Sequence, residues 1–253
     1  MRKAMIEFKL RLANINITAN VTYESTVRYA EDYLADFSNP DFAVTVEACD
    51  IVAEREKAKA QDEHDGITAE YSDAYLETLA LYRKIAEKMI DYDVILFHAS
   101  AISLDGECYL FTAKSGTGKS THTRLWREAF GERAVMVNDD KPLLAISDEG
   151  VTAFGTPWNG KHRLGSNISS PLKAICILER AESNSIEKTI GASEFPKIYS
   201  QTYRAHNPLF MQKTLALIDK LLQKVPVYKL CCNMEKDAPI VSYNGMKGND
   251  NEA

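Results

Sequence analysis

The sequence predicts an α/β fold with a mixed sheet, preceded by a small α+β domain. Three observations lead to this prediction: a glycine-rich loop at residues 113–121, a strand–turn–strand pattern leading into that loop, and an acidic pair after the next strand pattern. The chain has 253 residues, which is enough for one large domain, or for a small and a medium domain with a real core.

Residues 1–92 are expected to form the small α+β domain. Residues 6–17 alternate imperfectly between apolar and polar positions, as strands do, and residues 42–48 predict a further strand. A helix is expected over residues 23–37. The highly charged run 53–64 predicts an exposed helix or loop whose side chains are solvated.

A second helix of this domain is expected over residues 71–89, because large apolar residues recur there at helical spacing. The stripe on one face comprises Tyr75, Leu79, Tyr82, Ile85 and Met89. A stripe of this kind more often faces a protein core than a cofactor, so we expect it to be buried.

The larger domain is expected over residues 93–243. Residues 94–103 predict a strand, Asp105-Gly106 is typical of a hairpin turn, and residues 107–112 predict the return strand. The other expected elements are helices at 119–130 and 212–222 and strands at 134–138, 151–154, 173–179 and 226–232. Residues 244–253 are expected to be a disordered tail.

The glycine-rich loop predicts a phosphate-binding site between a strand and a helix. Gly116 and Gly118 let the backbone wrap around an anion, and the amides of residues 115–120 can point at phosphate oxygens. Lys119 would neutralise the β- and γ-phosphates of a nucleoside triphosphate, and the Ser120 hydroxyl would ligate Mg²⁺. The usual leading glycine is replaced by Ala113, where a single methyl group is often tolerated.

The predicted nucleotide-binding residues are Ala113, Lys114, Ser115, Gly116, Thr117, Gly118, Lys119, Ser120, Thr121 and, from a later loop, Lys161. The alternative is a Gly/Ser-rich turn before an ordinary helix, with Lys119 solvated. The strand before the loop, the helix after it and the acidic pair downstream favour nucleotide binding over that alternative.

Asp139-Asp140 follows a predicted buried strand, which is where a phosphate-loop enzyme holds a magnesium-organising carboxylate. Successive residues of a strand point to opposite sides, so one carboxylate would touch the metal and the other would face the phosphate acceptor. Without a phosphate loop beside it, the same pair would be interpreted as a solvated turn.

Three further residues are candidates with open alternatives. His98, in a predicted strand, either packs in the core or orients a carboxylate or the acceptor. Lys161 and Arg163 follow a Gly/Pro-rich loop and either place a cation over the transferring phosphoryl group or belong to the plain surface.

Composition narrows the class of protein. The formal net charge is −6 and Lys and Arg form no cluster, which argues against nucleic acid or an acidic membrane as a partner. The sequence has no apolar run of transmembrane length and its start lacks the apolar core of a signal peptide, which predicts a cytoplasmic protein. The five cysteines include no CxxC pair and are expected to be free thiols.

The loop from Ser115 to Ser120, with the hairpin before it, resembles HPr kinase/phosphorylase and the related nucleotide core of phosphoenolpyruvate carboxykinase. Residues 96–100 (LFHAS) resemble the strand of HPr kinase that bears its active-site histidine, and residues 137–140 (VNDD) resemble its acidic pair. The similarity covers about residues 94–180. Residues 155–161 occupy roughly the place of that enzyme's magnesium-binding glutamate but offer no carboxylate.

The resemblance implies a carboxykinase-like nucleotide core that transfers the γ-phosphate of ATP to a hydroxyl, with a serine of a peptide or small protein as the expected acceptor. It implies that Asp139 is the base, that Ser120 and Asp140 hold Mg²⁺, and that His98 and Arg163 assist. Relatives of this core often assemble, so a homo-oligomer is possible. Two alternatives stay open: a small-molecule kinase or carboxykinase-like metabolic enzyme, and a regulatory protein that binds ATP without catalysis.

Overall fold

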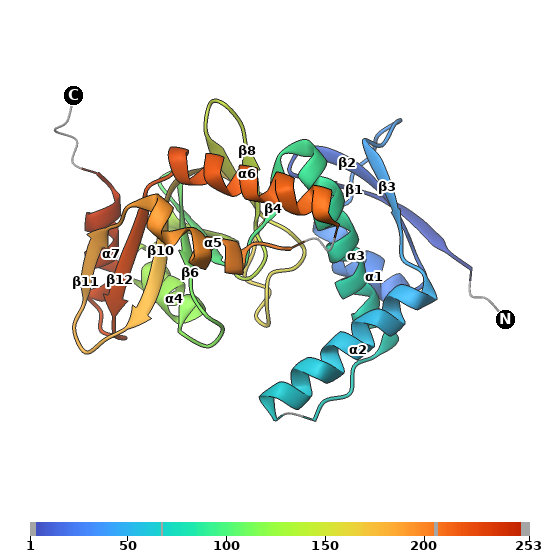
Figure 1. Ribbon diagram of the computed structural model, residues 1–253, viewed down its shortest axis with the longest axis horizontal. Coiled ribbons are helices and arrows are strands. Elements are labelled where there is room, and N and C mark those ends of the chain that lie inside the picture. Colours follow the sequence, from blue (N-terminus) through green and yellow to red (C-terminus); the bar gives the residue numbers. More distant parts are fainter. Residues whose placement is uncertain (1–3, 67, 205–206, 249–253) are drawn as a thin grey trace. The chain divides into compact units, whose positions relative to one another are not determined.

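The computed structural model describes residues 4–66, 68–204 and 207–248 of the chain (Figure 1). The chain divides into two compact units, Met1–Met89 and Ile90–Ala253.

The N-terminal unit is built on a three-stranded sheet in the order β1-β2-β3. Its strands are β1 (Ile6–Leu12), β2 (Ile15–Val21) and β3 (Phe42–Thr45), and its helices are α1 (Glu24–Tyr29), α2 (Ala48–Asp65) and α3 (Asp73–Met89). Strands β1 and β2 form an antiparallel hairpin, and β3 pairs with β2 in parallel. The hairpin turns at Ala13 and Asn14, which both adopt positive φ, as a two-residue turn of this kind requires.

The expected helix over 23–37 is wrong in length. Helix α1 ends at Tyr29, and a short 3₁₀ turn, η1 (Glu31–Tyr33), follows it. Ala30 and Tyr33 are both buried, so the chain leaves the helical path there in order to bring them into the core.

The charged run 53–64 lies within helix α2, and one of its residues is not solvated. Glu54 is buried, and its carboxylate pairs with Arg83 of α3 at 2.9 Å and with Lys57 at 2.9 Å. On α3 the predicted burial of the apolar stripe is confirmed for Tyr82, Ile85 and Met89. It is wrong for Tyr75, which is 47% exposed, and Leu76 lies in the core instead.

The C-terminal unit is an α/β structure with a curled, mixed sheet, which has nine strands among the described residues. Seven of them follow the order β4-β8-β9-β10-β6-β5-β7, while β12 pairs with β10 and β11 with β12. The strands are β4 (Val94–Leu96), β5 (Ser100–Leu104), β6 (Glu107–Thr112), β7 (Ala134–Asn138), β8 (Leu143–Ile146), β9 (Val151–Phe154), β10 (Ser169–Arg180), β11 (Ser185–Lys188) and β12 (Val227–Cys232). Strands β6, β10 and β12 run parallel, and β5, β7 and β11 run antiparallel to their neighbours. The expected mixed sheet is thereby confirmed.

Helices cover both faces of this sheet (Figure 1). They are α4 (Lys119–Phe130), α5 (Phe195–Gln201), α6 (Pro208–Lys224) and α7 (Ala238–Met246), with the 3₁₀ turns η2 (Ile90–Tyr92), η3 (Gly131–Arg133) and η4 (Gly191–Glu194). Alternate residues of β6 separate the layers: Leu110 packs in a cluster with Ile198 of α5 and Leu221 of α6, whereas Tyr109 packs with Trp126 of α4. Strand alternation therefore produces two cores, one on each face.

Several expectations for this unit need correction. Residues 94–103 are two strands, β4 and β5, because residues 97–99 leave the sheet and bond instead to segments distant in sequence. The expected tail at 244–253 is wrong for its first three residues, which belong to α7 and bury Met246 against the core. The tail residues 249–253 lie outside the described residues. Strands β8 and β11 and helices α5 and α7 were not predicted.

Candidate functional site

The glycine-rich loop joins β6 to α4, as predicted. Gly116 and Gly118 have φ angles of 76° and 127°, which L residues rarely adopt. A Cβ at either position would meet nothing within 4 Å. Glycine is therefore favoured at both positions by the backbone conformation and not by a lack of space for a side chain. Ala113 is buried in the cluster that contains Tyr109 and Trp126, where its methyl group fills core volume.

The Lys119 side chain is buried, with 8% of the residue exposed, and its ammonium group donates to the Ala113 carbonyl at 3.3 Å. Burial lowers the pKa of Lys119, and the nearby carboxylates of Asp140 and Asp139 oppose that effect. The Lys119 side chain is therefore folded back along the loop, and its ammonium group lies close enough to the carboxylates of the acidic pair to interact with them.

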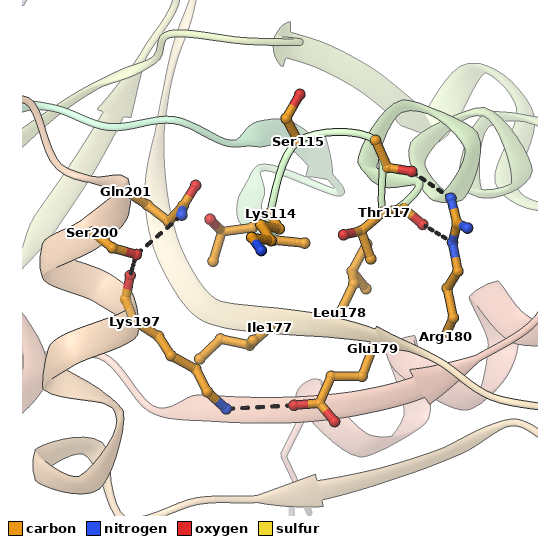
Figure 2. Close-up of a pocket in the computed structure, with 13 residues that line it drawn as sticks. Lys114, Ser115, Thr117, Ile177, Leu178, Glu179, Arg180, Lys197, Ser200 and Gln201 are labelled. Atoms are coloured by element: carbon orange, nitrogen blue, oxygen red, sulfur yellow. Dashed lines mark hydrogen bonds and ion pairs between the residues drawn. The ribbon is translucent and has the colours of Figure 1, made fainter. Parts of the chain in front are cut away.

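Arg180, at the end of β10, hydrogen-bonds to the backbone of the glycine-rich loop. Its guanidinium donates to the Thr117 carbonyl at 3.0 Å and to the Gly116 carbonyl (Figure 2). In a trans peptide the C=O and the following N–H point in opposite directions. The Gly118 amide consequently points away from Arg180, as an anion-binding loop requires.

Asp139 is almost fully buried, with 7% exposed, and Ser100 of β5 donates its hydroxyl to Oδ1 at 2.6 Å. Burial raises the pKa of Asp139, and the Ser100 and Ser120 hydroxyls oppose the increase. Ser120, the serine that was predicted to ligate Mg²⁺, lines the same cavity as Asp139.

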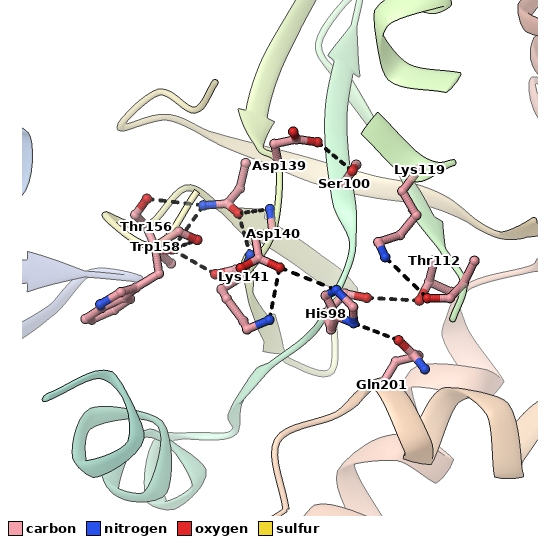
Figure 3. Close-up of polar contacts among 12 residues, drawn as sticks. His98, Ser100, Thr112, Lys119, Asp139, Asp140, Lys141, Thr156, Trp158 and Gln201 are labelled. Atoms are coloured by element: carbon pink, nitrogen blue, oxygen red, sulfur yellow. Dashed lines mark hydrogen bonds and ion pairs between the residues drawn. The ribbon is translucent and has the colours of Figure 1, made fainter. Parts of the chain in front are cut away.

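Asp140 points in a different direction, toward His98 and Lys141 (Figure 3). Its Oδ1 lies 3.0 Å from the Lys141 ammonium and 3.4 Å from Nε2 of His98. Burial, together with Lys141 and Lys119, lowers the pKa of His98 to about 4. The imidazole is neutral at pH 7, so its contact with Asp140 is not an ion pair.

Gln201, the last residue of α5, determines the tautomer of His98. The Ser200 hydroxyl donates to the Lys197 carbonyl at 2.7 Å, so its oxygen accepts from the Gln201 amide nitrogen at 3.1 Å. This turns Oε1 of Gln201 toward Nδ1 of His98, 2.9 Å away. Because Oε1 can only accept, Nδ1 carries the proton and Nε2 presents its lone pair to Asp140.

The backbone around His98 is held by the same segment. The His98 amide donates to the Gln201 carbonyl at 2.8 Å, and Thr112, the last residue of β6, donates its hydroxyl to the His98 carbonyl at 3.0 Å. His98 thus lies between β4 and β5, and not within a strand as predicted.

Asn138, the last residue of β7, bends the chain directly before the two carboxylates. Its amide nitrogen donates to the carbonyl of Thr156 at 3.1 Å and to the hydroxyl of that residue at 3.0 Å. Its Oδ1 accepts from the backbone amides of Asp140 at 2.8 Å and Lys141 at 2.6 Å. The chain bends here, so the acidic pair is displayed by a turn and not by strand alternation.

One cavity of ≈ 440 Å³ collects most of the predicted residues. It is lined by His98, Ser115, Gly116, Gly118, Lys119, Ser120, Thr121, Asp139, Asp140, Gly160, Lys161 and His162. Arg163 is not among the described residues that line this cavity. It is exposed and has a φ of 49°. Ala113, Lys114 and Thr117 line a neighbouring cavity on the other side of the loop.

The donor set fits Mg²⁺. Within the described part of the chain, no group of three or more His, Cys, Asp or Glu side chains could hold a metal by itself. Ser120 and the buried Asp139 carboxylate supply two oxygens, and Mg²⁺ in phosphate sites takes one or two protein ligands, with water and phosphate completing the shell. A cation would also stabilise the ionised form of a carboxylate whose pKa is raised by burial.

Several residues of the site had no role in the sequence prediction, among them Ser100, Asn138, Lys141, Arg180 and Gln201. Ser100 and Asn138 stand inside the short runs LFHAS and VNDD, so their proximity to the site was visible in the sequence. Gln201 carries no sequence signal, because it reaches the site only through the fold.

The described helices include none that is long and apolar enough to span a membrane. No model of a protein family matches the sequence, and no curated protein matches it either. Among solved structures, the HPr(Ser) kinase/phosphatase from Coxiella burnetii is similar over 60% of this chain and 88% of that chain, with 12% identity and a TM-score of 0.37.

Proposed function

We propose that this protein is an ATP- and Mg²⁺-dependent phosphotransferase with a carboxykinase-like, HPr-kinase-like nucleotide core. The observation that supports this proposal is a single ≈ 440 Å³ cavity lined by the loop residues, Lys119, Ser120, the two carboxylates and His98. Phosphoryl transfer asks for positioning, charge neutralisation and a proton acceptor, and this cavity offers a group for each.

The loop amides and Lys119 would bind the β- and γ-phosphates, with Lys161 at the rim as a further cation. Ser120 and Asp139 would hold Mg²⁺. When bound, Mg²⁺ supplies charge neutralisation across the phosphate oxygens. The contact between Asp139 and Ser120 supports this metal assignment and differs from the sequence prediction, which gave the metal to Asp140.

Asp140 would be the base, in exchange for the role that the sequence predicted for Asp139. Asp140 is less buried than Asp139 and accepts from no serine hydroxyl among the described residues. The acceptor oxygen would form a bond to the γ-phosphorus while the bond to the β–γ bridging oxygen breaks and ADP leaves. The acceptor proton would move to Asp140, which could then donate it in a hydrogen bond to the free lone pair of His98 Nε2.

The acceptor we propose is a serine hydroxyl of a peptide or small protein, in a cytoplasmic setting, and this part rests on the resemblance alone. The test is transfer of label from γ-labelled ATP, with Mg²⁺, to cell extract fractionated into proteins, peptides and metabolites. Labelled protein or peptide supports the proposed acceptor, and label in metabolites alone supports a small-molecule kinase. ATP binding without transfer to any fraction would indicate a regulatory protein and contradict the proposal.

A further inference from the structure

Two more cavities adjoin the phosphate-binding loop, one on each side of Arg180. The first, here called the α5 cavity, has ≈ 540 Å³ and is lined by residues 112–117, residues 177–180, Lys197, Ser200 and Gln201 (Figure 2). The second, here called the α4 cavity, has ≈ 430 Å³ and is lined by Gly116, Thr117, Gly118, Thr121, His122, Leu125, residues 178–181, Cys232, Asn233 and Met234.

We infer that the α4 cavity binds the nucleoside of the triphosphate, holding a planar, uncharged base and its ribose. This inference rests on the proposed function, because it assumes that the catalytic cavity takes the terminal phosphates.

Continuity with the catalytic cavity supports the α4 side. Gly116, Gly118 and Thr121 line both cavities. Lys119 and Ser120 line the catalytic cavity together with the acidic pair, and Thr121 lines both cavities. If the γ-phosphate lies at the acidic pair, the rest of the triphosphate can extend past Thr121 into the α4 cavity. The α5 cavity shares only Ser115 and Gly116 with the catalytic cavity.

The walls of the α4 cavity suit a heteroaromatic ring. Leu125 and Leu178 are buried side chains, Met234 is 75% exposed, and Ala181 adds a small residue between β10 and β11. A methionine exposed to this extent leaves apolar surface in water that a stacked base would cover, which is favourable.

The polar groups of the α4 cavity that could read a base are already engaged. The Asn233 side chain accepts from Asn184 at 3.0 Å and from the Glu235 amide at 2.9 Å, and it donates to the Glu182 carbonyl at 2.8 Å. The affinity for a base would then depend mainly on its shape and on stacking, not on hydrogen bonds to its edges. We therefore expect ATP and GTP to bind with similar affinity.

The α5 cavity offers a worse environment for a base. Glu179 and Arg180 line both cavities, but Lys114 and Lys197 line only the α5 cavity. The Lys197 ammonium lies 3.4 Å from the Glu179 carboxylate, and Figure 2 shows the two side chains pointing toward one another. An uncharged base placed there would remove water from charged groups without replacing their hydrogen bonds, which costs free energy.

His122 provides an independent indication of a ligand at the α4 cavity. The residue is 3% exposed, and its Nε2 contacts Ser242 Oγ at 3.0 Å and Trp126 Nε1 at 3.2 Å. Its Nδ1 is buried and has no hydrogen-bond partner among the described residues. A ribose hydroxyl, which can both donate and accept, would satisfy Nδ1 in either tautomer.

Two matched variants of the full chain test the inference: Ala181→Trp fills the α4 cavity, and Lys197→Trp, at an exposed position, fills the α5 cavity. Binding of ATP and of inorganic tripolyphosphate, each with Mg²⁺, is measured by calorimetry. We expect Ala181→Trp to weaken ATP binding about tenfold or more while tripolyphosphate binding stays within about twofold, and Lys197→Trp to leave both unchanged. Met234→Ala, at an exposed position that folding does not depend on, should weaken ATP binding in the same selective way.

The inference is overturned if Lys197→Trp weakens ATP binding selectively and Ala181→Trp does not, or if Ala181→Trp and Met234→Ala both bind ATP like the parent chain. An equal loss of both ligands in Met234→Ala would also count against it, since the loop and not the nucleoside contact would then be affected. Failure of the proposed function looks different, because the parent chain would then bind ATP without transferring its phosphate, or would bind neither ATP nor tripolyphosphate.

Discussion

Nε2 of His98 lies 3.4 Å from Oδ1 of Asp140, and the proton of the imidazole is on the opposite nitrogen, held by Gln201. A neutral histidine in this tautomer cannot donate to Asp140, but it can accept from it once Asp140 is protonated. A proton taken up by Asp140 could therefore be shared with His98. Asp139, which accepts from Ser100, has no such neighbouring imidazole lone pair among its hydrogen-bond partners in the described residues.

Asp140→Asn should abolish transfer while ATP binding is retained. An amide cannot take the acceptor proton, so we expect the rate of transfer to fall by about 10²–10⁴-fold with little change in ATP affinity. Asp139→Asn is the matched variant, and it should instead weaken binding of the Mg²⁺–ATP complex and raise the Mg²⁺ concentration needed. Label transfer and calorimetry over a Mg²⁺ series separate the two. If Asp139→Asn loses transfer at saturating Mg²⁺ and Asp140→Asn keeps it, the roles predicted from the sequence are the right ones.

Lys119→Met should remove the stabilisation that ATP gives to the folded chain. Methionine keeps the buried apolar stem but removes the charge that neutralises the phosphates. We expect the rise in Tm with ATP to disappear, whereas the Tm without ATP should not fall. Lys197→Met is the control outside the catalytic cavity and should retain the ATP-dependent rise. An unchanged rise in Lys119→Met would contradict the assignment of the loop.

Local signals predicted part of this site well. Strand β6 and helix α4 occur with the expected bounds, 107–112 and 119–130, because an apolar run, a glycine-rich turn and a helical pattern follow one another directly. The position of His98 was not predictable in the same way. Residues 94–103 resemble one continuous strand, and backbone hydrogen bonds to distant segments interrupt it. These bonds join it to Asp140 and Pro142, about forty residues later, and to Gln201 and Tyr203, about a hundred residues later.

The exchange of roles that we propose for the two aspartates has a similar origin. The sequence argument assumed that Asp139 and Asp140 alternate along a strand. Strand β7 ends at Asn138, and the side chain of that residue accepts from the next backbone amides and bends the chain. Whether an asparagine continues a strand or ends it depends on its partner, here Thr156, which lies in another loop.

Gln201→Leu should lower the rate of transfer without changing the KM for ATP. Leucine retains a branched side chain, one atom shorter, that cannot accept from Nδ1, so the tautomer of His98 is no longer determined. Gln201→Glu retains an acceptor oxygen and should recover most of the rate, with a pH profile shifted because its charge favours the protonated imidazole. Equal rates in Gln201→Leu and the parent chain would show that Gln201 does not position His98.

Glu77→Ala should destabilise the N-terminal unit by about 3 kcal/mol. The Glu77 carboxylate is fully buried on α3 and accepts from the Thr22 amide at 2.6 Å, the Tyr23 amide at 3.0 Å and the Thr26 hydroxyl at 2.6 Å. It thereby satisfies free amides at the start of α1, where a negative charge is also favoured. Denaturant unfolding measures the loss, and Glu56→Ala on the exposed surface of α2 should cost little. A small loss in Glu77→Ala would show that water replaces the carboxylate.

The stability of the C-terminal unit should fall as the pH is lowered from about 6.5 to about 4. Burial lowers the pKa of His122 to about 4, from an ordinary value near 6.5. Between these values the unfolded chain binds a proton that the folded chain excludes, so acidification favours unfolding, whereas above pH 6.5 this contribution is constant. His122→Gln keeps a side chain that can hydrogen-bond with Ser242 but does not titrate. Its Tm should therefore decrease less than that of the parent chain between pH 7 and pH 5, when both are measured without nucleotide. A parallel decrease in the two chains would assign the pH dependence to other groups, of which His98, with a similarly lowered pKa, is the next to replace.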